Sequence, residues 1–388
     1  MNNKVVFAPL RQRKRDIPEL VDYLLKRSAQ IYKRPVPPVN EEAMGKLLSH
    51  DYLQKNITEL AEALERAFQI AENDRIESEH IFLGVALGNI GPGINLLRIK
   101  PLMAAIQKKI YPGYFQAAVT LAFVTNICLN LFGTKDHSQN WGTMISWSLG
   151  WPSFVFCVLF FGRLTCSVCP MSNIASFFQR FFHLAKPIPA FIKKNDYLII
   201  TFLFVFILWI EEITNMRQSP RATGILFLSI VSGAVITAVL LPRHSWRRHI
   251  CPLGDMFGVC SMASPLELRS NAELCLNKCT TYSCYKGADN NPGCPLFQHV
   301  PFIDNNQDCK LCMNCVRSCP NGSVQLNLRP PAMEIWDLVR VRRSMTVFVA
   351  ALLMIIFPLI IFNMLHESLT HSQWFLWFTV YYWLLKLH

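Results

Sequence analysis

Charged residues are scarce in this sequence: Asp, Glu, Lys and Arg make up 16% of its 388 residues, against about 25% in soluble globular domains. Hydrophobic residues reach 52%, and the mean hydropathy is +0.25. So much apolar surface excludes disorder as the main state, and its clustering argues against a wholly soluble protein. We therefore expect the net charge of +12 in loops beside a membrane rather than on a nucleic-acid-binding face.

Several cofactor motifs are also missing. The sequence has no Gly-x-Gly-x-x-Gly fingerprint and no phosphate-binding loop, so it indicates no dinucleotide or nucleotide site. It has no Cys-x-x-Cys-His, which excludes covalent c-type haem. No histidine falls inside a long apolar run, which argues against a bis-histidine haem within a helical bundle. These runs hold almost no ionisable groups, which argues against an ion or proton channel.

Long apolar runs are abundant. A transmembrane helix needs about 20 predominantly apolar residues, and six runs are candidates: 114–132, 143–162, 196–213, 223–241, 345–363 and 373–386. The sixth is short and rich in Trp and Tyr, so it either crosses the membrane or lies at its surface.

Basic residues set the expected orientation. No apolar segment follows the basic stretch Arg11–Arg15, so the sequence predicts no secretory signal and a cytoplasmic segment over 1–112. Lys and Arg gather before the first and fifth runs and after the second and fourth. Because such loops stay inside, we expect a multi-pass protein of the cytoplasmic membrane with its N-terminus and residues 264–330 in the cytoplasm.

The cysteines carry the clearest chemical signal. Eight of the fourteen fall between Cys275 and Cys319. The second half of this region reads Cys309-x-x-Cys312-x-x-Cys315-x-x-x-Cys319-Pro320, which is the run that binds [4Fe–4S] clusters in bacterial ferredoxins. A zinc site is the main alternative, although zinc motifs typically supply cysteines as spaced pairs.

A second cluster needs four more thiolates. A looser run, ending in Cys-Pro like the first, supplies Cys275, Cys279, Cys284 and Cys294. In two-cluster ferredoxins the fourth cysteine of a run binds the other cluster. The sequence therefore predicts one cluster on Cys275, Cys279, Cys284 and Cys319, and the other on Cys309, Cys312, Cys315 and Cys294.

Four further cysteines lie at the ends of predicted spans. Cys166 and Cys169 follow the second apolar run, and Cys251 and Cys260 follow the fourth. The two segments look like an internal repeat in which basic residues precede a Cys-Pro pair. The four thiols can hold a third cluster, form a redox-active pair or line a quinone pocket, or they can simply be packed thiols.

These motifs resemble the membrane polyferredoxins over residues 113–335. This group includes the integral iron–sulfur subunit of the periplasmic nitrate reductase system, the nitrous-oxide reductase accessory protein and the iron–sulfur protein of haem–copper oxidase assembly. The resemblance rests on the cysteine motifs and on the pairs Gly162-Arg163 and Arg247-Arg248. It implies electron transfer between the quinone pool and a redox partner, through [4Fe–4S] clusters.

The sequence departs from this family in three respects. Cys166 and Cys169 are separated by two residues, where three are common. Cys251 has no near partner upstream, and no periplasmic flavin domain is present. The sequence therefore does not identify the reductase or oxidase that is the redox partner. We interpret the chain as an electron-transfer subunit of a membrane redox complex rather than a complete enzyme; the alternatives are a copper-handling reductase for maturation, or a cluster-containing membrane anchor.

The N-terminal segment has a helical pattern. Apolar residues recur on one face of Ile57–Ile70, with Asn56 or Thr58 as the candidate cap. Residues 58–98 resemble, over a short stretch, a repeat of the Clp-type chaperone N-terminal domain, through Ala63–Ala67, Glu79–Leu83 and Leu96–Leu97. A generic helical domain that docks a protein partner is the other interpretation.

The predicted architecture is mainly α. A helical cytoplasmic docking domain covers 1–112, and four transmembrane helices with two Cys-Pro motifs cover 113–263. A small α+β two-cluster ferredoxin domain at 264–335 is inserted between spans four and five, and one or two membrane helices follow at 336–388.

Overall fold

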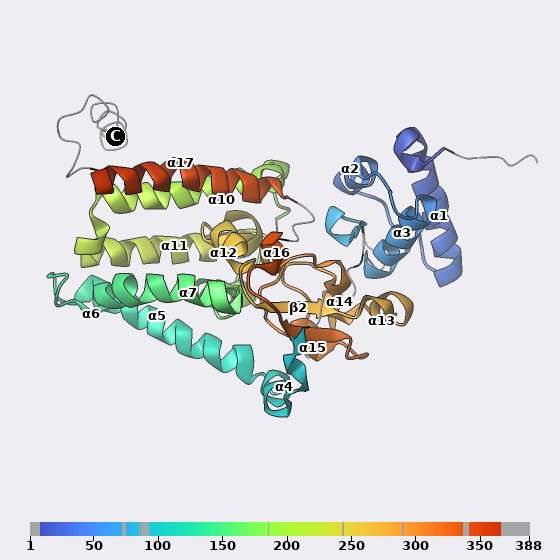
Figure 1. The fold of residues 1–388 in the computed structure, drawn as a ribbon. Coiled ribbons are helices and arrows are strands. Elements are labelled where there is room, and N and C mark those ends of the chain that lie inside the picture. The colour runs from blue at the N-terminus through green and yellow to red at the C-terminus, as the bar shows by residue number, and fades with distance from the viewer. Residues whose placement is uncertain are drawn as a thin grey trace, which may run out of the picture. The chain divides into compact units, whose positions relative to one another are not determined.

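The computed structural model describes residues 8–71, 75–84, 86, 93–184, 186–242, 244–288, 291–336 and 341–365. The sixth apolar run, 373–386, lies outside them. The chain is mainly helical (Figure 1). It divides into two compact units, which are described separately: unit 1 is Met1–Asn95, Leu268–Asp304 and Met313–Asn327, and unit 2 is Leu96–Glu267, Asn305–Cys312 and Leu328–His388.

Three helices form the N-terminal part of unit 1: α1 (Ile17–Tyr32), α2 (Glu41–Ser49) and α3 (Ile57–Ala71). The helical prediction for 57–70 is confirmed, because Leu60, Leu64 and Phe68 of α3 are completely buried in one apolar core. The predicted cap of α3 stays a prediction, and Asn56 has another role as well. Its side-chain oxygen accepts a hydrogen bond from the backbone amide of Leu10 at 2.8 Å, so it ties down the preceding chain.

The rest of unit 1 consists of short elements. They are α13 (Ala272–Asn277), α14 (Ser283–Lys286), α15 (Asn314–Ser318) and the hairpin of β3 (Gly287–Ala288) and β4 (Asn291–Pro292). The hairpin is antiparallel, with Gly287 opposite Pro292. A three-stranded sheet has the order β1 (Ile94–Asn95), β5 (Val324–Leu328), β2 (Leu266–Ser270).

An aromatic cluster joins these two parts of unit 1. Phe82 contacts the rings of Tyr285, His299 and Phe302, with centroids 5.6–5.8 Å apart. The guanidinium of Arg66 lies 4.8 Å above the Phe302 ring and also donates to the Phe82 carbonyl. The helical domain is therefore packed on the chain that carries the first cysteine run.

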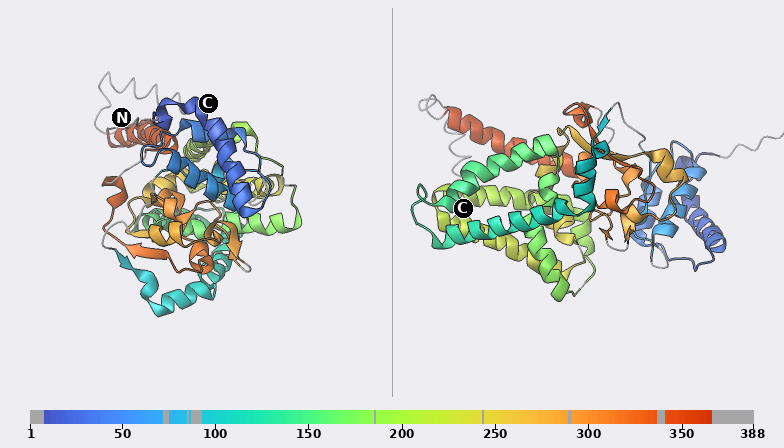
Figure 2. Two further views of the ribbon diagram at one scale, coloured as in Figure 1. Left: turned by 90° about the vertical axis from the view of Figure 1, so that its right-hand side faces the viewer. Right: turned by 90° about the horizontal axis from the view of Figure 1, so that it is seen from below.

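Unit 2 is built from longer helices. They are α4 (Lys100–Gln107), α5 (Phe115–Phe132), α6 (Trp141–Thr143), α7 (Trp151–Phe161), α8 (Leu164–Ser167), α9 (Pro170–Phe181), α10 (Ala190–Ile213), α11 (Pro220–Leu240), α12 (Gly254–Ser261), α16 (Met333–Trp336) and α17 (Arg343–Leu365). In Figures 1 and 2, α10 runs beside α17 and α5 beside α11.

Three helical segments are long and apolar enough to cross a membrane: Ile110–Phe132, Trp141–Phe161 and Pro220–Leu240. They correspond to the first, second and fourth predicted spans. The third prediction falls on α10, whose backbone leaves helical geometry at Asn195, and the fifth falls on α17. The apolar stretch Arg343–Met354 of α17 is shorter than a full span among the residues described. The structure therefore supports a helical membrane protein, and six crossings stay a prediction.

Polar side chains and a glycine hold these helices together near one end. The Thr143 hydroxyl donates to Asn130 at 3.1 Å, and both residues are buried. The indole of Trp147 donates to Thr223 on α11 at 3.1 Å. A Cβ at Gly224 would lie 2.8 Å from Leu131, so a glycine is required where α11 meets α5. Small residues and interhelical hydrogen bonds are how helices associate within lipid.

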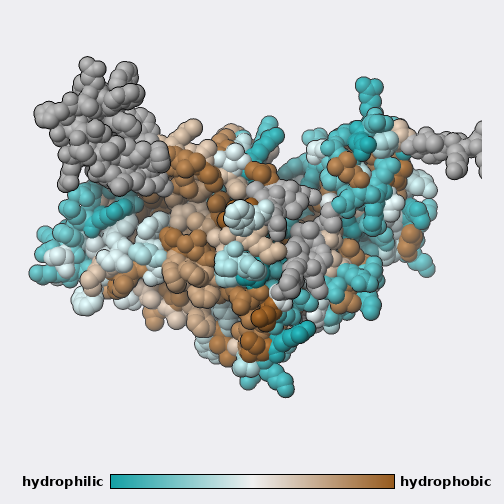
Figure 3. Space-filling model, viewed as in Figure 1, coloured by the Kyte–Doolittle hydropathy of each residue, from teal (hydrophilic) through white to brown (hydrophobic). Residues whose placement is uncertain are grey.

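The surface of unit 2 agrees with this interpretation. Large apolar side chains point outward from the bundle; Leu121 and Phe202 are 70% and 65% exposed. Figure 3 shows apolar residues gathered over the bundle helices in that view. Exposed apolar area of this extent marks a surface that lipid or a partner covers.

Candidate metal centre

The first cysteine run occupies short helices of unit 1. Cys275 lies on α13 and Cys284 on α14, and both are buried. Burial raises the pKa of the Cys284 thiol to about 12, and the nearby thiols of Cys275, Cys279 and Cys294 raise it further. The structure thus brings the four cysteines of this run into mutual electrostatic range. A metal centre there displaces their protons, since thiolates are the ligands.

One serine connects this run with the end of the second. The Ser323 hydroxyl lies 3.1 Å from the Cys275 sulfur and 3.3 Å from the Cys319 sulfur. The backbone fixes this arrangement, because the Asn271 amide donates to the Ser323 carbonyl at 2.9 Å. The Asn271 side chain also caps α13 by accepting from the Leu274 amide. Cys275 and Cys319, 44 positions apart in the sequence, therefore share one hydrogen-bonding group.

The second run begins in unit 2 and ends in unit 1. In unit 2, Leu311 has a left-handed backbone (φ 53°), and its amide donates to the Cys309 sulfur at 3.4 Å. In unit 1, Cys315 lies on α15 and the Cys319 amide donates to the Cys315 carbonyl at 3.0 Å. Left-handed leucine is uncommon, so surrounding contacts must hold this turn in place.

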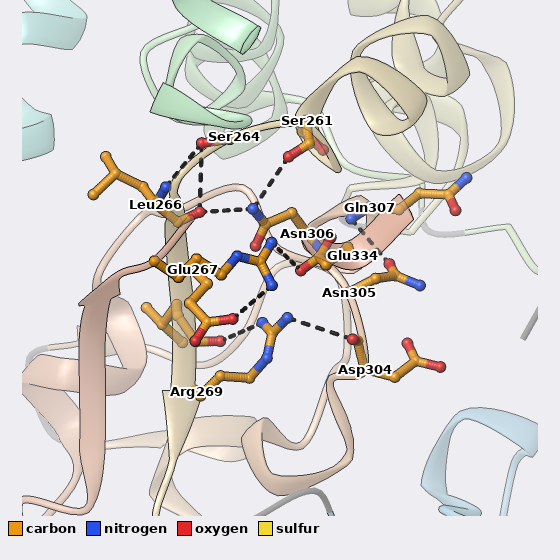
Figure 4. Close-up of polar contacts among 12 residues, drawn as sticks. Ser261, Ser264, Leu266, Glu267, Arg269, Asp304, Asn305, Asn306, Gln307 and Glu334 are labelled. Atoms are coloured by element: carbon orange, nitrogen blue, oxygen red, sulfur yellow. Dashed lines mark hydrogen bonds and ion pairs between the residues drawn. The ribbon is translucent and has the colours of Figure 1, made fainter. Parts of the chain in front are cut away.

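Four side chains elsewhere in unit 2 bind the segment Asn305–Cys312. Arg163 donates to the Gln307 carbonyl, and Arg342 makes a bidentate ion pair with Asp308. Figure 4 shows Asn306 at the centre of a buried network. Its amide side chain donates to the Ser261 and Leu266 carbonyls, and its backbone amide donates to Glu334 at 2.8 Å. The fourth side chain, Tyr111, donates to the Leu311 carbonyl at 2.8 Å.

Sequence reasoning missed these supporting residues. Arg163 carried the only signal, as part of the Gly162-Arg163 pair. Its side chain hydrogen-bonds to Cys166; burial alone lowers its pKa, but Cys166, Cys251 and Asp308 hold that pKa above the ordinary value. Tyr111, Asn306 and Ser323 belong to no motif, so nothing in the sequence distinguished them.

The cysteines at the span ends also come together in part. Cys166 lies on α8, and Cys169 precedes α9. Burial raises the pKa of Cys251 to about 12, and Cys169 and Cys166 contribute. Cys260, on α12, packs with Cys166 against one apolar cluster, whereas Cys251 packs against another around Trp246. Within the described residues, each of these cysteines is a thiol and not part of a disulfide.

No three Cys, His, Asp or Glu residues converge to hold one metal ion, as far as the structure describes the chain. Beside the cysteine sulfurs the described chain places a serine hydroxyl and a backbone amide within hydrogen-bonding distance. These donors fit an iron–sulfur cluster.

Glu211 lies near the C-terminal end of α10. Its carboxylate pairs with Arg217 Nε at 2.9 Å, and the carboxylate is largely buried. This ion pair links the C-terminal end of α10 to the segment that follows it.

Comparisons with known proteins point in two directions. Residues 11–86 match the model of the AAA+ ATPase lid domain. No comparison supports the resemblance of 58–98 to a Clp-type repeat. The chain is 35% identical over 94 residues to the transcriptional regulatory protein ZraR of Salmonella typhi, covering 24% of this chain and 21% of that protein.

Two further relatives are named as an electron transport protein and a ferredoxin-type protein. The chain is 37% identical over 120 residues to the putative electron transport protein YccM of Escherichia coli, covering 30% of this chain and 31% of that protein. It is 25% identical over 194 residues to the ferredoxin-type protein NapH of Escherichia coli, covering 43% of this chain and 62% of that protein. The chain thus spans less than two thirds of each relative. No solved structure matches.

Proposed function

We propose that this chain is an integral membrane iron–sulfur subunit that passes electrons between the quinone pool and a redox partner. One observation carries the proposal: Ser323 holds Cys275 and Cys319 on the same hydroxyl. This pairs the first run with the Cys-Pro end of the second, as an exchanged fourth ligand requires. The likeness to YccM and NapH and the three membrane-length helices support it.

Two [4Fe–4S] clusters are the proposed cofactors, and when bound they supply one-electron transfer. Cys275, Cys279, Cys284 and Cys319 hold one, and Cys309, Cys312, Cys315 and Cys294 hold the other. The chain's own residues fix the positions of the cysteine ligands and tune the reduction potential of the clusters. The Ser323 hydroxyl and the Leu311 amide place positive hydrogen atoms against thiolate sulfur, and such bonds set the reduction potential.

The proposed electron donor or acceptor in the membrane is a quinone. One quinol oxidised to quinone releases two electrons, one for each cluster, and two protons, which go to water. The basic loops support the proposal that this exchange occurs at the cytoplasmic membrane, with the cysteine runs on the cytoplasmic side. Other subunits of a membrane redox complex complete the pathway.

The N-terminal domain is proposed to dock a protein partner. Its match to an AAA+ lid covers residues 11–86, a helical domain without a nucleotide-binding motif of its own. Within unit 1 its Phe82 packs against Tyr285, next to Cys284. A partner bound to this domain is thereby recruited to the part of the chain that carries the first cysteine run.

Iron and sulfide analysis tests the proposal directly. We expect roughly eight irons per chain for two cubanes, at four irons each; roughly twelve indicates a third cluster at Cys166, Cys169, Cys251 and Cys260. Cys309→Ser should remove one cluster signal in electron paramagnetic resonance, and Cys128→Ser, at an exposed position on α5, should remove none. A preparation that binds zinc alone contradicts the proposal. Copper binding that is lost on replacing Cys166 and Cys169 favours a metal-handling reductase instead.

A further inference from the structure

The segment that leads into the second cysteine run is fastened to the ends of the membrane helices. Leu311, between Cys309 and Cys312, is 1% exposed. Its side chain lies over Gly162 at the end of the second span, where an added Cβ would sit 3.4 Å from the Leu311 methyl group. Gly162 itself has a left-handed backbone, with φ at 62°. The glycine thus leaves the space that the leucine side chain occupies.

The backbone of the same leucine is fixed from a second direction. Tyr111, at the start of the first candidate span, donates its hydroxyl hydrogen to the Leu311 carbonyl at 2.8 Å. The Tyr111 oxygen also hydrogen-bonds to Ser167, which is fully buried next to Cys166. Gln116 of α5 donates to the Ser167 carbonyl at 2.7 Å. One tyrosine therefore links the Cys309–Cys312 turn to the Cys166–Cys169 loop.

We propose that Tyr111 is the positioning residue of the Cys309–Cys312 turn, and that the cluster bound there is the one that exchanges electrons with the membrane. This inference rests on the proposed function. It assigns an order of electron transfer: the Cys309 cluster exchanges electrons with the membrane quinone, and the Cys275 cluster exchanges them with the protein partner.

The direction of the Tyr111 effect follows from the hydrogen bonds. The Leu311 amide donates to the Cys309 sulfur while its carbonyl accepts from Tyr111. Donors to thiolate sulfur favour the reduced cluster, which carries one more negative charge. Loss of the tyrosine hydroxyl frees the carbonyl, loosens the turn and weakens the bond from the amide to sulfur. The potential of that cluster then falls.

The test is a redox titration of the full chain, purified without oxygen, followed by electron paramagnetic resonance. Cys309→Ser and Cys275→Ser first identify the two signals. Tyr111→Phe should then shift the Cys309-dependent signal to lower potential by a three- to tenfold change in the reduction equilibrium, where tenfold is 59 mV for one electron. The Cys275-dependent signal should not move. Tyr114→Phe is the matched control, because Tyr114 is 72% exposed and three residues away.

A second measurement uses the unsubstituted protein. After mixing with duroquinol and freezing within milliseconds, the Cys309-dependent signal should appear before the Cys275-dependent one. Two outcomes overturn the inference while leaving the proposed function intact: the Cys275 signal appears first, or Tyr111→Phe moves neither signal or moves only the Cys275 signal. A preparation without iron instead defeats the proposed function itself.

Discussion

The Arg329 guanidinium lies 2.8 Å from the Glu267 carboxylate, and both side chains are almost fully buried, at 5% and 0% exposed. Arg329 also pairs with Glu334 at 2.7 Å. Removing the cation leaves two carboxylates buried without their counter-ion. We expect Arg329→Met to lower the free energy of unfolding by about 3–5 kcal/mol, measured by thermal unfolding in detergent. Arg180→Met, at an exposed position on α9, should change it by less than about 0.5 kcal/mol; equal effects would show that the pair contributes nothing.

Ser323 offers a second test of how hydrogen bonds to sulfur set the reduction potential, at the other proposed cluster. Its hydroxyl lies within hydrogen-bonding distance of the sulfurs of both Cys275 and Cys319. Ser323→Ala should lower the potential of the Cys275-dependent signal by up to about 59 mV, a tenfold change in the equilibrium, and should leave the Cys309-dependent signal in place. Ser318→Ala is the control, since the buried Ser318 hydroxyl has no hydrogen-bond partner among the described residues. A shift in both signals, or in neither, argues against the ligand assignment.

His299 predicts how stability depends on pH. Burial, with a contribution from Arg66, lowers the pKa of this imidazole from 6.5 to about 3. Between those values the unfolded chain binds one more proton than the folded chain, so stability falls as the pH falls. At pH 5 the loss is about 2 kcal/mol.

A non-titrating variant isolates this contribution. His299→Gln should lose about 2 kcal/mol less than the unsubstituted protein between pH 7 and pH 5. Chemical unfolding at the two pH values measures the difference. Parallel losses in both proteins would mean that the imidazole is protonated in the folded state.

The backbone conformation of Gly162 predicts that replacing this glycine lowers the stability of the protein. Its dihedral angles, φ 62° and ψ −150°, lie in a region that is essentially restricted to glycine. Gly162→Ala should cost about 1–3 kcal/mol and disturb Leu311, whose side chain the new methyl group meets. Gly113→Ala, where an added Cβ meets nothing within 4 Å, provides the comparison in thermal unfolding. A Gly162→Ala protein as stable as the Gly113→Ala protein would contradict the predicted strain.

The features that sequence reasoning found are the periodic and the local ones. The α3 helix was evident because its buried face repeats every 3.6 residues, and the apolar spans and cysteine spacings lie within short stretches. The hydrogen bond between the Asn56 side chain and Leu10, 46 positions away, was not predicted. A propensity for capping states what a residue can do and does not identify its partner.

The residues that support the cysteines could not be found in this way. Tyr111 and Leu311 are 200 positions apart, and their contact is one hydroxyl to a main-chain carbonyl. Such a bond places no requirement on the residue type at 311. Ser323 likewise lies outside the Cys-Pro motif, and only the fold returns it to Cys275.

The contacts that hold Leu311 have a consequence for how the proposed clusters are loaded. Its amide, carbonyl and side chain all contact protein atoms. A zinc finger, by contrast, folds only with its ion. For the proposed clusters, iron and sulfide would therefore meet a turn that protein contacts already hold in place.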